Sequence, residues 1–131
     1  MASRRMKSLL IASLVIVSGL FAYAWAETAI SIRVAPNVLN ILSDGDVVTV
    51  HTNIGFSLVD ASSVVLNGVP ISWWKADNCG NFVAKFSMDD IKQLDWNLDQ
   101  LNTVTLSGVT VGGESFSGSA EILVVMNEPK I

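Results

Sequence analysis

The sequence predicts an all-β fold made of two packed sheets, and two observations lead to it. Apolar residues alternate with polar ones along several short runs, and a turn signal separates each run from the next. Such alternation is typical of antiparallel sheets that have one face on a core and the other toward solvent. Seven or eight short strands in about 100 residues favour an immunoglobulin-like β-sandwich of about seven strands.

The first 26 residues are expected to be a secretory signal peptide. The basic start "MASRRMK" precedes an uncharged apolar stretch that ends in "AWA" at 24–26, a small-x-small cleavage pattern. The alternative is an uncleaved membrane anchor, since about 18 apolar residues can just span a bilayer. Cleavage would leave 27–131 as one domain and would send it to the periplasm or the extracellular space.

The composition of this domain excludes some functions. The expected signal contains three of the eight basic residues and none of the twelve acidic ones, so the net charge of 27–131 is 5 − 12 = −7. A domain this acidic has no electrostatic basis for binding nucleic acid or an anionic membrane surface. Cys79 is the only cysteine, so no internal disulfide can form and the core must be held by packing.

The expected elements follow each other closely along the chain. The turn signals are "SDGD" at 43–46, Asn67-Gly68, "DNCGN" at 77–81 and Gly112-Gly113. Alternating runs, each expected to be a strand, lie at 29–34, 47–54, 81–86, 103–111 and 120–125.

One short helical turn is expected near 87–94, crossing from one sheet to the other. Ser87 is the predicted N-cap and Asp90 follows three residues later, a capping-box arrangement. Ile91 and Leu94 should face inward, and Trp96 with Leu98 should continue as a packed connection.

Several motifs resemble a secreted immunoglobulin-like module of bacterial and archaeal exported proteins. They are the opening "ISIRVAPNVLNILSDGDVVTVHTNI", the hairpin "VVLNG" at 64–68, "VAKF" at 83–86, and "TLSG" at 105–108 followed by Gly113, Phe116 and Gly118. That family has no assigned catalytic activity and often forms part of larger surface or secreted proteins. The resemblance implies a non-enzymatic exported binding or assembly module of the cell envelope or extracellular space.

The stretch "WWKADNCGNF" at 73–82 is the main place to look for chemistry. Asp77 and Asn81 could give two oxygen ligands, too few for calcium, and Cys79 between them is a soft ligand. His51 is the only histidine and is expected on an outward strand face, with no spacing that links it to Cys79. We therefore expect a hairpin corner at 77–81, with no catalytic residue, metal or cofactor. Cys79 could still join two chains through a disulfide.

The two adjacent tryptophans are the candidate binding residues. Consecutive residues on a strand point to opposite faces, and counting along "VPISWW" puts Trp73 with Val69 and Ile71 on the apolar side. We therefore predict Trp73 in the core and Trp74 on the outer face, as the candidate ligand-binding residue. An exposed tryptophan could contact a protein or polysaccharide partner of the envelope. The alternative function is thus a carbohydrate-binding domain, unless a loop or the Trp96 region covers the ring.

Overall fold

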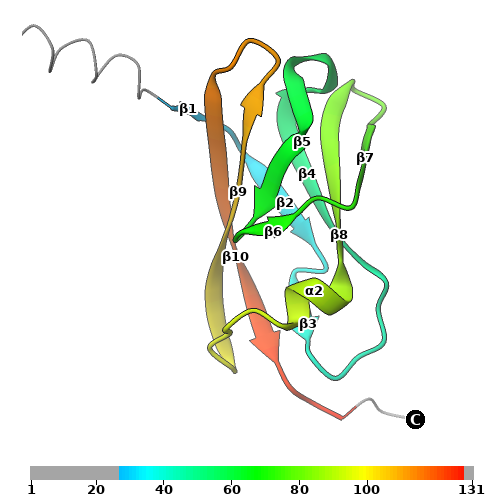
Figure 1. The fold of residues 1–131 in the computed structure, drawn as a ribbon. Coiled ribbons are helices and arrows are strands. Elements are labelled where there is room, and N and C mark those ends of the chain that lie inside the picture. Colours follow the sequence, from blue (N-terminus) through cyan, green and yellow to red (C-terminus); the bar gives the residue numbers. More distant parts are fainter. Residues whose placement is uncertain (1–26, 129–131) are drawn as a thin grey trace, which may run out of the picture.

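The computed structural model describes residues 27–128, so the predicted signal peptide at 1–26 lies outside the described residues. Two sheets pack face to face in this part of the chain (Figure 1). The predicted all-β sandwich is confirmed. No helix within 27–128 is long and apolar enough to cross a membrane.

The order of strands in the two sheets is that of an immunoglobulin-like sandwich. In such folds, strands A, B, E and D form one sheet and C, F and G form the other. The four-stranded sheet runs β2 (Ile32–Ala35), β4 (Val47–Gly55), β8 (Asn81–Ser87), β7 (Trp73–Ala76). The six-stranded sheet runs β1 (Thr28–Ala29), β10 (Ser115–Val125), β9 (Gln100–Thr110), β5 (Val59–Leu66), β6 (Val69–Pro70), with β3 (Val38–Asn40) also paired to β10.

Ten strands form within residues 27–128 where about seven were predicted, because the first strand is divided into three and the two-residue β6 adds one more. The chain pairs with β10 through β1, crosses to pair with β4 through β2, and returns to β10 through β3. The crossing is close, since the carbonyl oxygen of Ile30 lies 2.6 Å from where a Cβ on Gly118 would sit. Only glycine leaves room for the backbones to approach this closely.

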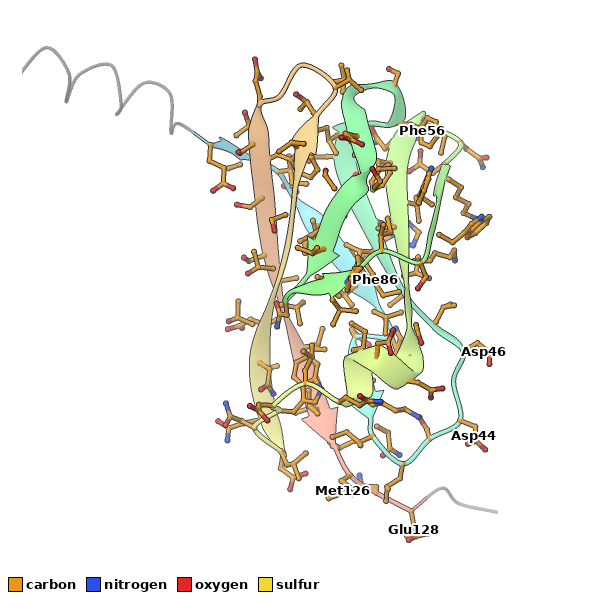
Figure 2. All side chains as sticks on the ribbon, in the orientation of Figure 1. Asp44, Asp46, Phe56, Phe86, Met126 and Glu128 are labelled. Atoms are coloured by element: carbon orange, nitrogen blue, oxygen red, sulfur yellow. The ribbon has the colours of Figure 1, made fainter. Side chains whose placement is uncertain are left out.

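The core lies between the sheets and is filled by the alternating apolar side chains. Phe82, Phe86 and Phe116 are its largest members and are all fully buried; Phe86 points into the space between the sheets in Figure 2. Burying a phenylalanine contributes roughly 1.5–3 kcal/mol to stability. The alternating apolar side chains of β4, Val48, Val50 and Ile54, are buried as well.

The predicted helical crossing is present as α2 (Met88–Lys92), which joins β8 of one sheet to β9 of the other. Ile91 is buried as expected, and Trp96 packs against the core while its Nε1 donates to the Ile91 carbonyl at 2.9 Å. Two details differ from the prediction. Ser87 occupies the N-cap position but its side chain makes no capping hydrogen bond, and Leu98 is exposed.

The turns form where the glycine and asparagine signals predicted them. Asn67 and Gly68 have φ values of 47° and 83°, as a two-residue hairpin loop of type I′ requires. They join β5 to β6. A 3-10 helix, η1 (Phe56–Leu58), links β4 to β5, and Phe56 lies at the opposite end of the molecule from α2 (Figure 2).

Candidate binding site

Trp73 is 54% exposed, so the prediction that it lies in the core is wrong. The count along "VPISWW" assumed one continuous strand, but the chain changes sheets there. Ile71 N donates to the Val64 carbonyl of the six-stranded sheet at 3.1 Å, and Ser72 N donates to the Lys85 carbonyl of the four-stranded sheet at 2.9 Å. The alternation of side chains between core and solvent does not continue through such a crossing, because the inner face is defined separately in each sheet.

Trp74 is exposed as predicted, but its face is the opposite of the predicted one. In the β7–β8 register Trp74 lies opposite Ala84, which belongs to the core, while Trp73 lies opposite Lys85. Directly opposed residues share a face, so Trp74 is on the core side and Trp73 on the solvent side. Trp74 remains 39% exposed because β7 is an edge strand of its sheet.

The outer face of the four-stranded sheet carries Trp73 on one edge strand and three basic side chains, of which Lys75 and Lys85 are its neighbours and Arg33 is on the opposite edge strand. Its members lie in two rows that the strand registers align across the sheet. We call this surface the cationic face. One row is Arg33, His51, Val83 and Lys75; the other is Ala35, Thr49, Lys85 and Trp73.

Contacts within the cationic face hold the ring of Trp73 in place. Lys85 Nζ lies 5.8 Å from the ring centroid of Trp73 and donates to Thr49 Oγ1 at 3.0 Å. An ammonium at this distance is attracted to the ring by a cation–π interaction. Val83, between His51 and Lys75 in its row, is fully buried, so neighbouring side chains cover it.

The charge on this face is opposite in sign to that of the domain. Residues 27–128 contain four basic side chains, and three of them, Arg33, Lys75 and Lys85, belong to the cationic face. The fourth, Lys92, is on α2 and donates to the Ser43 carbonyl. Many of the acidic residues lie away from the face, and Figure 2 shows Asp44, Asp46 and Glu128 around the end of the molecule that holds α2.

A shallow hollow of about 280 Å³ lies at one end of the cationic face. Arg33, His51, Asn53 and Asp77 are among its lining residues, and His51 therefore lies on the outward face where the sequence predicted it. The Asp77 carboxylate is engaged in the adjoining turn, where its Oδ1 accepts the backbone N–H groups of Cys79 at 2.8 Å and Asn81 at 2.9 Å. The hollow thus presents a guanidinium, an imidazole, the carboxylate of Asp77 and the NH2 group of Asn53, whose Oδ1 already accepts from Ser31 N at 2.9 Å.

Residues 77–81 form the predicted hairpin corner between β7 and β8. Asp77 N donates to the Asn81 carbonyl at 2.9 Å, and Gly80 has a φ of 80° that favours glycine. Cys79 is exposed and free. Across residues 27–128, no group of three or more His, Cys, Asp or Glu side chains is placed to hold a metal ion.

Comparisons with known proteins found no family model, curated protein or solved structure that matches this chain. Its function is therefore inferred from its own residues. Sequence reasoning singled out Trp74 and missed Arg33, Lys75 and Lys85. Alternation within β8 already put Lys85 on the solvent side, opposite to Phe82 and Phe86, but nothing in the sequence shows which residues of other strands lie beside it.

Proposed function

We propose that the protein is a non-enzymatic exported binding or assembly module of the secreted immunoglobulin-like type. It acts in the cell envelope or the extracellular space and binds its partner through the cationic face. The observation that carries the proposal is the exposed ring of Trp73, with Lys85 opposite it on β8 and Lys75 two residues along its own strand. Tryptophan and arginine are the residues that most often dominate binding energy at interfaces, and here both lie outside the core.

The sequence motifs support the exported and non-enzymatic parts of the proposal. The resemblance described above is to exported modules without assigned catalytic activity. His51 and the basic residues stand on an outer sheet face and beside a shallow hollow, whereas enzymes usually surround the reacting groups and exclude water. These features favour recognition over chemistry.

A carbohydrate-binding domain is the second candidate. Aromatic side chains have an apolar face that can stack on a sugar ring, and Trp73 and Trp74 are both exposed. Trp73 is the better platform, because its ring stands on the outer face and is held by Lys85, while Trp74 is at the sheet edge. Both candidates use the same surface.

The experiment is an affinity capture from an envelope extract with the full-length protein carrying a C-terminal tag. Wild type, Trp73→Ala and Leu101→Ala are compared, and both proteins and glycans in the captured fraction are identified. Leu101 is the matched control because it is a large apolar side chain, 60% exposed, on the outer face of the six-stranded sheet.

We expect wild type and Leu101→Ala to retain the same partner and Trp73→Ala to lose it. Retention of that partner by Trp73→Ala would show that the cationic face is not the binding surface. A wild-type sample that retains nothing beyond a blank resin would argue against a binding module.

A further inference from the structure

We propose that the ligand of the cationic face is an anionic polysaccharide. The ring of Trp73 stacks on a sugar, and Arg33, Lys75 and Lys85 contact the anionic groups of the chain. This inference rests on the proposed function, because it assumes that the cationic face is the binding surface, and it goes further by naming the ligand class.

Charge is the first argument for an anionic ligand. The domain is acidic overall, yet three of the four basic side chains within 27–128 share one sheet face. At physiological ionic strength, charges farther apart than about 8 Å are largely screened from each other. A ligand in contact with this face therefore interacts mainly with its three basic side chains, and with Asp77 at the hollow, rather than with the acidic residues around α2.

Geometry is the argument for a sugar polymer. Arg33 and Lys75 are at the two ends of one row across four strands, which is three strand spacings or roughly 14 Å. An extended chain laid along this row would contact both ends, with His51 between them. Trp73 is in the neighbouring row, and its ring is already ordered by Lys85, so stacking would lose little conformational entropy.

The side chains also match the groups that such a polymer carries. A guanidinium can bind a carboxylate or sulfate through two parallel hydrogen bonds, and Arg33 offers one at the hollow beside His51. Lysine ammonium groups provide point charges that tolerate different positions of the anion. A sugar hydroxyl can accept from the NH2 group of Asn53 at the same hollow, since Asn53 Oδ1 already accepts from Ser31 N.

Other macromolecules fit this face less well. Duplex DNA carries a negative charge every 1.7 Å or so along its axis, a density that three cations on a domain of net charge −7 do not balance. A stable protein interface has an apolar core, but the large apolar side chains exposed on this face are Trp73 and Val47. A polysaccharide with one charge per sugar has a lower charge density than duplex DNA, and it can bind without an apolar core at the interface.

The test measures binding of the tagged full-length protein to polygalacturonate by calorimetry at low and at high salt. We expect wild type to bind and the affinity to fall at least about tenfold at high salt, since ion contacts are exchanged for counterions. Trp73→Ala should weaken binding about tenfold or more. Arg33→Gln and Lys75→Gln should each weaken it up to about fivefold.

Lys92→Gln is the matched charge control, because it removes the same charge from α2 and should leave affinity unchanged. Three further probes distinguish the ligand classes. Dextran sulfate bound with the same dependence on Trp73 would support the proposal with sulfate as the anion. If fully methyl-esterified polygalacturonate bound as tightly as polygalacturonate, the charge would not contribute to recognition. If poly-glutamate bound as tightly and independently of Trp73, the sugar would not contribute. Either result overturns the proposal.

Failure of this inference can be told apart from failure of the proposed function. If no anionic polymer binds while the affinity capture still retains a partner through Trp73, the ligand class is wrong and the binding module stands. If neither assay finds a ligand, both proposals fail.

Discussion

At the scale of single residues, the exposed fraction of an aromatic side chain determines how much it contributes to the free energy of unfolding. Trp73→Ala removes a ring that is 54% exposed, so we expect the free energy of unfolding to fall by only about 1 kcal/mol, mainly from the lost cation–π contact with Lys85. Phe86→Ala, in the core, should lower it by about 3–5 kcal/mol. Urea denaturation of both variants measures the difference. Equal losses of unfolding free energy would indicate that Trp73 is a core residue.

Gly118 is needed where the first strand crosses between the sheets, because any side chain there would meet the backbone of Ile30. An alanine Cβ there would lie 2.6 Å from the Ile30 carbonyl oxygen, a backbone atom that cannot move without disturbing the strand crossing. We expect Gly118→Ala to reduce the free energy of unfolding by about 1–3 kcal/mol. Gly112→Ala is the control, since its nearest neighbour would be 3.8 Å away. If both variants had the same melting temperature, the strand crossing would accommodate a Cβ at Gly118 without strain.

At the scale of elements, the β7–β8 hairpin depends on the side chain of Asp77. Its Oδ1 accepts two backbone N–H groups of the turn, and removing a side chain that satisfies backbone donors usually costs about 1 kcal/mol or more. Asp77→Ala should therefore lower the free energy of unfolding by about 1–2 kcal/mol. Asp77→Asn keeps the acceptor oxygen and should be close to wild type in stability. If urea titrations showed that Asp77→Asn and Asp77→Ala lose the same free energy of unfolding, the charge of Asp77 would be the stabilising feature instead.

The elements themselves were largely predictable from alternation. Within one strand the alternation indicates the face correctly: Phe82, Ala84 and Phe86, which share one face of β8, are all buried in the core. The pattern failed between Ile71 and Ser72, where the backbone hydrogen bonds pass from one sheet to the other. No residue type marks that crossing, so the inner face could not be followed through it.

The cationic face could not be predicted because it depends on registers between distant strands. Arg33 meets His51, and Lys85 meets Trp73, only once β2, β4, β8 and β7 are aligned. Net charge was a misleading guide here. A count over the domain gives a negative value, but it says nothing about where the few basic side chains gather.

At the scale of the whole molecule, the described fold begins close to the expected cleavage site. The first strand starts at Thr28, two residues beyond the "AWA" pattern at 24–26. We predict that an exporting cell releases a protein with Glu27 at its N-terminus, because a small-x-small site follows the apolar stretch. Intact-mass spectrometry of the purified protein checks this, and a membrane fraction that contains only the form with Met1 would indicate an uncleaved anchor.

The divided first strand also bears on how the protein responds to mechanical load. Both β1 and β3 run parallel to the last strand, β10, so the first and last strands lie side by side in the same direction, while the described chain starts at one end of the molecule and finishes at the other (Figure 1). A force that pulls the ends apart acts along these strands and strains all of their shared hydrogen bonds at once. A hairpin pulled open from one end would instead release its bonds one after another. The geometry therefore suits a domain that stays folded under tension between two attachment points.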